Sequence, residues 1–85
     1  MEIDMQLFGA LRGLADGDVL RIQVNGTSIA DARAAVATFA EAHWPASKVA
    51  LLPSCAFASS TSLLRDAMPL PEDGHLVILP PVNGG

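Results

Sequence analysis

Hydrophobic residues change their spacing along the chain in a definite order, and this order limits the folds that are open to it. They alternate with polar residues near the N-terminus, recur every three or four residues in the middle, and form a continuous run near the C-terminus. Alternation is typical of a strand with one buried face, and the wider spacing is typical of an amphipathic helix. The sequence therefore predicts two strands, a helix and at least one further strand.

The two alternating segments lie within the first 24 residues. Apolar residues occupy positions 3, 5 and 7, and again positions 20, 22 and 24. Asp16-Gly17-Asp18 supplies turn-forming residues between the two segments. We expect an N-terminal hairpin with a long loop.

The helical pattern predicts a helix from about Ile29 to His43. Ser28 and Asp31 have the spacing of a capping box at its start, and Pro45 ends it. One apolar stripe runs along this helix: Ile29, Ala32, Val36, Phe39 and His43.

The remaining part of the chain gives weaker signals until its last strand. Residues 49–52 fit a short strand or a turn, residues 55–58 fit a strand, and residues 59–62 form a polar break. A Pro- and Gly-containing turn cluster at 69–74 precedes the apolar run His75 to Leu79. We interpret this run as a strand buried on both faces.

This order of elements fits an α+β domain in which one helix packs across one face of a mixed sheet. Connection rules favour pairing of the last strand with the first. The arrangement is that of the β-grasp, or ubiquitin-like, fold. We expect a single domain over residues 1–85 with a tail at 80–85.

Charge and composition narrow the possible partners. The net charge is −4, with one lysine and four scattered arginines, so no basic stripe is available for nucleic acid. An acidic surface favours a basic protein partner. No apolar run approaches the roughly 20 residues that cross a bilayer, and the acidic N-terminus does not resemble a signal peptide. With a single cysteine, Cys55, these features favour a cytoplasmic protein without a membrane partner.

The chain ends on Pro80-Pro81-Val82-Asn83-Gly84-Gly85, directly after the last predicted strand. Glycine has no Cβ, so a diglycine can follow a channel that is too narrow for side chains and can place a carboxylate in a partner's active site. The two prolines restrict the backbone and keep it extended. The alternative is a disordered end without a function.

Four segments resemble one family. Residues 5–12, with an aromatic residue followed by Arg12, are similar to its first strand. The capped helix, the turn at 69–74 and the ending at 80–85 also match. The chain thus resembles the small subunit of molybdopterin synthase, the MoaD branch of the ubiquitin-like sulfur carriers that also includes ThiS. It departs from the family pattern at residues 58–62, where an Asn-containing motif is common, and at His75, where an acidic residue is common.

The resemblance implies a chemistry centred on Gly85. Its carboxylate would be adenylated by an E1-like activating enzyme that uses ATP, and would then become a thiocarboxylate. The large subunit of molybdopterin synthase would receive the tail in a hetero-oligomer and pass the sulfur to cyclic pyranopterin monophosphate. The chain lacks the GxxxxGK and GxGxxG motifs, so we expect no stably bound cofactor and assign ATP to the activating enzyme.

The resemblance also implies a partner-binding surface beside the tail. Phe8, Leu63 and Leu79 would form an apolar docking patch, with Arg12 near the same edge. The alternative for Phe8 is a place in the core. The tail itself would supply the remaining partner-binding residues: Pro80, Pro81, Val82, Asn83 and Gly84.

Other reactive residue types have simpler interpretations. Cys55 is expected to be a small buried hydrophobe, and Trp44 a packing residue at the helix end. His43 and His75 have no spacing that suggests a metal or hydrolase site. Two alternative functions stay open: a ThiS-like thiocarboxylate donor for thiamine, cysteine or another metabolite, and an unmodified β-grasp interaction module.

Overall fold

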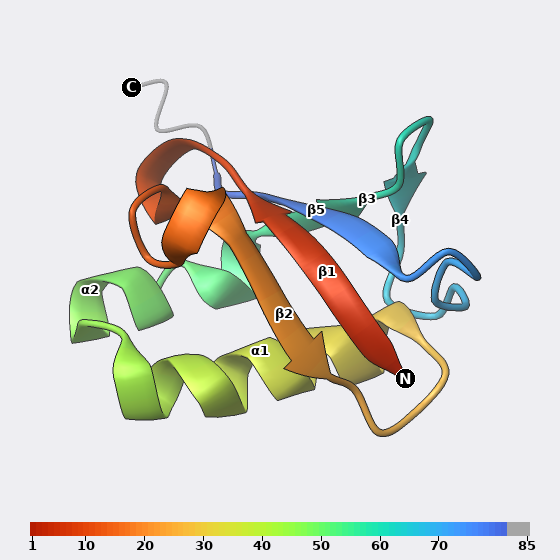
Figure 1. Cartoon of the computed structure of the whole chain (residues 1–85), viewed down its shortest axis with the longest axis horizontal. Coiled ribbons are helices and arrows are strands. Elements are labelled where there is room, and N and C mark those ends of the chain that lie inside the picture. Colours follow the sequence, from red (N-terminus) through yellow and green to blue (C-terminus); the bar gives the residue numbers. More distant parts are fainter. Residues whose placement is uncertain (82–85) are drawn as a thin grey trace.

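The computed structural model describes residues 1–81 and shows a five-stranded sheet with one long helix beneath it (Figure 1). The strand order is β2-β1-β5-β3-β4, so β5 lies at the centre between β1 and β3. The strands are β1 Glu2–Leu7, β2 Val19–Gln23, β3 Ala56–Ala58, β4 Leu63–Leu64 and β5 His75–Leu79. The helices are α1 Ile29–His43 and α2 Ala46–Val49, with 3₁₀ turns at Gly9–Leu11, Asp16–Asp18 and Leu52–Ser54.

The predicted N-terminal hairpin is confirmed. β1 and β2 are antiparallel, with Met5 opposite Leu20, and Asp16–Asp18 forms a 3₁₀ turn between them. The predicted pairing of the last strand with the first is also confirmed. β5 runs parallel to β1, with Leu7 beside Ile78, so the chain leaves the sheet at the end where β1 also finishes.

Helix α1 has the predicted bounds because its ends are encoded locally. The Ser28 hydroxyl accepts the Asp31 N–H, and the Asp31 carboxylate accepts the Ser28 N–H in return, which completes the capping box. Trp44 leaves the helix in an extended conformation, as expected before Pro45. The predicted stripe is wrong at its end: His43 is exposed and Ala40 is buried instead, because Ala40 is the residue one turn after Val36.

The segment after α1 differs from the prediction. Residues 49–52 form no strand. The alternative, a turn, is confirmed at residues 50–51, which join the short helix α2 to a 3₁₀ turn at Leu52–Ser54; the helix itself, which follows Pro45, was not expected. The strand expected at residues 55–58 is confirmed as β3, Ala56–Ala58. β4 was not predicted as such, since two residues carry no periodicity.

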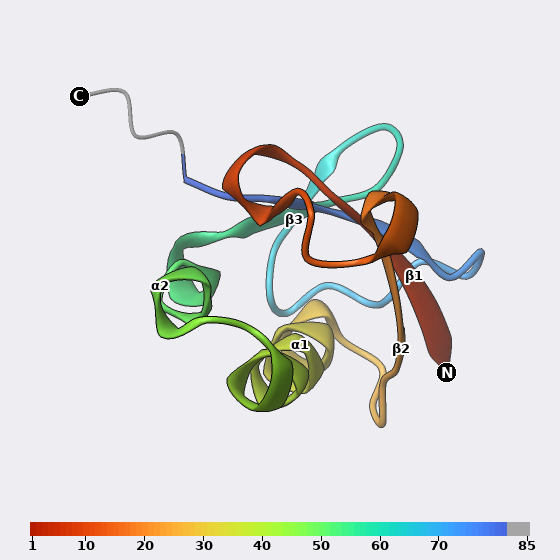
Figure 2. The same ribbon diagram turned by 60° about the vertical axis from the view of Figure 1, so that its left-hand side comes forward.

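The prediction that β5 is buried on both faces is wrong. Leu76 and Ile78 are buried, whereas Val77 and Leu79 are half-buried and His75 is exposed. Both helices lie on the same side of the sheet (Figure 2), so no helix among residues 1–81 covers the outer face. The continuous apolar run therefore belongs to a central strand, but it does not indicate that both faces of this strand are buried.

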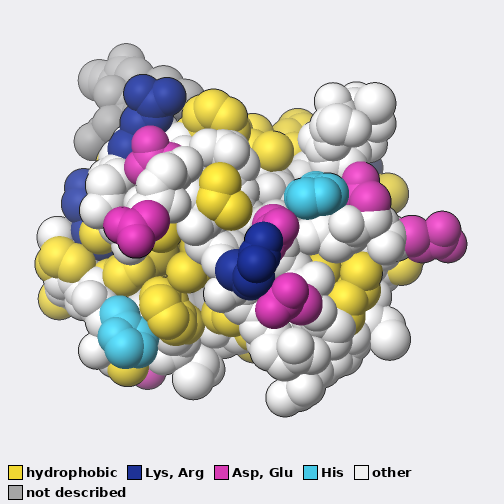
Figure 3. Space-filling view, in the orientation of Figure 1, with side chains coloured by type: hydrophobic (Ala, Val, Ile, Leu, Met, Phe, Trp, Pro, Cys, Tyr) yellow, Lys and Arg dark blue, Asp and Glu magenta, His cyan; other side chains and the backbone are white. Residues whose placement is uncertain are grey.

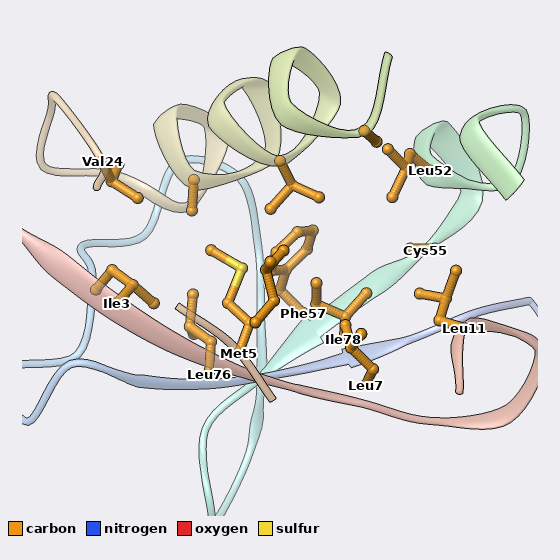
Figure 4. Close-up of a cluster of buried hydrophobic side chains, with 14 of the residues drawn as sticks. Ile3, Met5, Leu7, Leu11, Val24, Leu52, Cys55, Phe57, Leu76 and Ile78 are labelled. Atoms are coloured by element: carbon orange, nitrogen blue, oxygen red, sulfur yellow. The ribbon is translucent and has the colours of Figure 1, made fainter. Parts of the chain in front are cut away.

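The core lies between the inner face of the sheet and α1 (Figure 4). Ile3, Met5 and Leu7 of β1 point toward the helix together with Phe57, Leu76 and Ile78 from neighbouring strands. Cys55 is buried at one end of this layer and Trp44 is also buried, as the sequence predicted for both. Among the described residues, no helix combines the length and the hydrophobicity needed to span a bilayer.

Candidate functional site

The end of β5 fixes where the tail begins. β5 lies between β1 and β3, and it passes directly into half-buried Pro80 and exposed Pro81. A strand held on both edges gives the tail a rigid starting point. The other predicted tail residues, Val82, Asn83, Gly84 and Gly85, lie outside the described residues.

Gly9 packs against this starting point. Its φ of 57° lies in the left-handed region, and a Cβ on it would lie 3.0 Å from Cγ of Pro80. Only glycine combines that backbone conformation with such a close approach. The first 3₁₀ turn, Gly9–Leu11, is thus fitted to the start of the tail.

A groove of about 440 Å³ lies where these two segments meet. It is lined by Phe8, Gly9 and Ala10 from the end of β1 and by Leu79, Pro80 and Pro81 from the end of β5. Phe8 is 38% exposed, and it follows Leu7 on the face opposite the core. The structure therefore places Phe8 and Leu79 together beside the tail, with an aromatic ring open to solvent. We call these six residues the tail groove.

Leu63 lies apart from the tail groove. It is 67% exposed and pairs with Ala58, which in turn pairs with Val77 of β5. Its neighbour Leu64 pairs with buried Phe57, so Leu63 points to the outer face of the sheet, as Phe8 and Leu79 do. The structure puts the three residues of the predicted patch on one face, and only Phe8 and Leu79 in one groove.

Two basic residues lie at the same end of the molecule. Arg12 is exposed at the end of the first 3₁₀ turn, and its backbone N–H donates to the Gly9 carbonyl at 3.1 Å. Lys48 donates from Nζ to the Ala10 carbonyl at 2.7 Å and so ties α2 to the tail groove. Figure 3 shows basic side chains at the upper left of the molecule and hydrophobic ones along the upper edge beside them. No sequence pattern indicates the contact between Lys48 and Ala10, because the two residues lie 38 positions apart in the chain.

The cysteine is not arranged as a nucleophile. Cys55 is 3% exposed, and its thiol donates to the Leu51 carbonyl at 3.3 Å. Burial raises the pKa of the Cys55 thiol, and nearby Arg33 offsets this only in part. The thiol is therefore protonated at neutral pH and closed to substrates.

Asp4, Ser60 and His75 line a hollow on the outer face, but they do not form a hydrolytic site. Arg21 donates to the Asp4 carboxylate at 2.7 and 3.3 Å, and this hydrogen bonding lowers the pKa of Asp4. The nearest approach of His75 Nδ1 to Asp4 is 4.0 Å, beyond hydrogen-bond distance. Among residues 1–81, no hydrogen bond links Ser60 to His75. The Asp4 carboxylate is therefore hydrogen-bonded to Arg21 and does not orient His75.

Comparison with known proteins gives a fold. No family model and no curated protein matches the chain. The crystal structure of SAMP1 from Haloferax volcanii is similar, with a TM-score of 0.67 and 19% sequence identity over 100% of both chains. At this identity the likeness concerns the fold alone. The strand order, the single long helix and this match together show that the chain has the β-grasp, ubiquitin-like fold predicted from its sequence.

Proposed function

We propose that this chain is a ubiquitin-like sulfur carrier, and that it serves as the small, sulfur-donating subunit of molybdopterin synthase. The observation that carries the proposal is the tail groove at the end of a central strand, directly before a Pro-Pro-Val-Asn-Gly-Gly sequence. The fold supports a ubiquitin-like modifier or a sulfur carrier. The resemblance of the tail to that of the MoaD branch favours the carrier.

The chemistry proposed for Gly85 has two steps. Its carboxylate oxygen attacks the α-phosphorus of ATP on an E1-like activating enzyme, which forms an acyl-adenylate and releases pyrophosphate. The sulfur of a partner persulfide then attacks the acyl carbon, and AMP leaves. A thiol on the partner cleaves the resulting S–S bond, so that the chain keeps a thiocarboxylate and the partner keeps a disulfide.

The residues of the folded body hold and present this tail. Gly9 and Pro80 fix where it begins, and the exposed Phe8 ring with Leu79 offers an apolar surface to a partner. Arg12 and Lys48 add positive charge at this end of an acidic protein. A partner that docks here thus meets the tail groove and the start of the tail at once. The catalytic acids and bases would come from the large subunit.

Sulfur transfer from a loaded chain tests the proposed role. The chain is prepared with a C-terminal thiocarboxylate by intein cleavage with sulfide, and is mixed with a molybdopterin synthase large subunit and cyclic pyranopterin monophosphate. We expect dithiolene formation and return of the chain to its carboxylate mass. A Gly84→Leu chain loaded in the same way is the control, because its added side chain would block a narrow channel, and we expect it to transfer little sulfur.

The second candidate is a ThiS-like donor, because the departures at residues 58–62 and at His75 weaken the match to the MoaD branch. Transfer of sulfur to the thiazole-forming system of thiamine synthesis, with none to cyclic pyranopterin monophosphate, would select it. A loaded chain that gives up no sulfur to either system would count against both roles.

A further inference from the structure

We propose that the free edge of β2 and the groove beside it bind an extended, apolar segment of a partner protein that carries a basic residue. In this complex the segment adds a sixth strand to the sheet. The site is separate from the tail groove, and the proposal does not depend on the chemistry of Gly85.

β2 offers unpaired backbone groups along its outer edge. Within the described residues its only neighbour in the sheet is β1. Met1 and Val24 exchange two hydrogen bonds, at 2.8 and 2.9 Å, so they form a hydrogen-bonded pair. Hydrogen-bonded and non-hydrogen-bonded pairs alternate along an antiparallel ladder. Gln23 and Arg21 therefore belong to non-hydrogen-bonded pairs, and their backbone N–H and C=O groups point away from β1.

An independent contact fixes this alternation. Asp4 lies opposite Arg21, and its N–H donates to the Gly74 carbonyl at 2.8 Å, on the side of β1 that faces β5. Asp4 and Arg21 are therefore a non-hydrogen-bonded pair, and the backbone groups of Arg21 point outward. An added strand can accept and donate at these positions as β1 does on the other side.

A groove of about 500 Å³ runs between this edge and α1. Ile22 from β2 and Ala35 and Phe39 from α1 are only half-buried in its walls, although each also packs against the core. Exposed Ala34 and Thr38 complete the helix side and leave room for larger groups. Alternate side chains of an added strand would enter this groove, which requires them to be apolar.

The charge of the groove selects among apolar segments. Asp31 lines one end, and hydrogen bonds from the Ser28 and Thr27 backbone N–H groups lower the pKa of its carboxyl, so it is ionised at neutral pH. None of the residues that line the groove is basic. In a protein with a net charge of −4, this end attracts a lysine or arginine of the incoming segment.

A second copy of the chain fits this edge less well than such a segment. Antiparallel pairing of two β2 strands centred on Arg21 would set two arginines opposite each other, and like charges in that position are destabilising. Two copies that each carry a net charge of −4 also repel. The occupant that the edge favours is therefore a basic, extended segment of a different protein.

The position of the groove allows both surfaces to work at once. Gln23, Asn25 and Asp31 lie where β2 ends and β1 begins, because these strands are antiparallel. The tail starts at the opposite end of the sheet, where β1 and β5 finish. A partner held at β2 would thus leave the tail groove free for a second protein.

The test titrates ¹⁵N-labelled protein with a decapeptide of alternating valine and threonine that has a lysine at each end. We expect chemical-shift changes and slower amide exchange at Arg21 and Gln23, shifts along the groove face of α1, and none at Phe8 or Gly9. The same peptide with N-methyl groups on the valines or on the threonines serves as the control. Methylation of the set that bonds to β2 should weaken binding at least about fivefold.

Two protein variants sharpen the result. Thr38→Arg puts a bulky cation into the groove wall and should weaken binding about tenfold. Ala30→Arg adds the same charge to an exposed position on α1 outside the groove, and should bind as the unmodified protein does. No shifts with millimolar peptide, or shifts centred on the tail groove or on β4, would overturn the proposal. Shifts of Arg21 and Gln23 that follow protein concentration alone would overturn it in favour of a second copy.

Discussion

Gly9 and Pro80 touch so closely that a Cβ on residue 9 would lie 3.0 Å from Cγ of Pro80. Through this contact, the loop that follows β1 sets the direction in which the chain leaves β5. The start of the tail is therefore part of the folded body, although the two residues lie near opposite ends of the sequence.

Replacing Gly9 with alanine is expected to disturb both stability and tail position. The left-handed backbone at φ 57° costs a non-glycine residue about 1 to 2 kcal/mol, and the new Cβ also presses on Pro80. Gly13→Ala is the matched control, because its φ is 87° but nothing lies within 4 Å of its Cβ. Thermal unfolding should show a stability loss for both variants, larger for Gly9→Ala, and adenylation assays should show impairment for Gly9→Ala alone. Equal adenylation by the two variants would contradict a positioning role for Gly9.

Phe8 is expected to act in binding more than in folding. With 38% of its surface exposed, Phe8→Ala should cost well under the 3 to 5 kcal/mol, roughly, that a buried phenylalanine contributes. If Phe8 anchors the partners, the same change should weaken docking by about 2 kcal/mol or more. Chemical denaturation and titration calorimetry with the activating enzyme and the large subunit measure the two effects.

Leu63→Ala is the comparison for Phe8→Ala, since Leu63 lies on the same face but outside the tail groove. A partner that covers the whole outer face should lose affinity with both variants. A partner confined to the tail groove should respond to Phe8→Ala alone. Unchanged affinity after Phe8→Ala would remove the docking role of the tail groove.

Arg33 is expected to be the most important charged residue for stability. Its Nη1 donates to the Leu52 and Cys55 carbonyls at 3.0 and 2.8 Å, and its guanidinium lies 4.8 Å from the ring centre of Phe57. Arg33→Met should cost about 2 to 3 kcal/mol in urea unfolding, because two carbonyls lose a charged donor. Arg21→Met removes an exposed arginine from Asp4 and should change stability little. Equal losses of unfolding free energy for Arg33→Met and Arg21→Met would contradict this prediction.

The capping box predicts a pH dependence. Backbone hydrogen bonds from Ser28 and Thr27 lower the pKa of Asp31 below its ordinary value of 3.8. Because the pKa of Asp31 is lower in the folded state, its ionised carboxylate stabilises the folded protein fully above pH 3.8. This stabilisation is lost as the pH falls through the pKa of the folded state. Asp31→Asn should unfold at a lower temperature at pH 7 and show a smaller decline between pH 5 and pH 2. A decline identical to that of the unmodified protein would exclude Asp31 as a contributor.

The structural features that could be predicted from the sequence are those that residues close together in the chain determine. Helix α1 was placed within its observed bounds because Ser28, Asp31 and Pro45 act within a few residues of its ends. The alternation of apolar and polar residues along β1 and β2 likewise requires only that each strand buries one of its faces. The two-residue strand β4 and the helix α2 were missed or misassigned, since neither is long enough to show a period.

The candidate site could be predicted only in part, because it depends on contacts between residues that lie far apart in the chain. The tail and Phe8 stand out in the sequence, but the contacts of Gly9 with Pro80 and of Lys48 with Ala10 join residues far apart in the chain. Val77 and Leu79 are half-buried because, in the part of the chain that the structure describes, no helix covers the outer face of the sheet, and the composition of a strand does not reveal this. Such features follow from the packing of the whole domain.

The intact mass of the protein tests the central claim most directly. The chain is incubated with an E1-like activating enzyme, ATP and sodium sulfide, and is then measured by mass spectrometry beside a variant with one alanine added after Gly85. If Gly85 is activated and loaded with sulfur, the chain should gain about 16 Da, the change from oxygen to sulfur, and the extended variant should stay unmodified. An unchanged mass under conditions in which the enzyme loads a known sulfur carrier, or equal loading of the extended variant, would contradict the account.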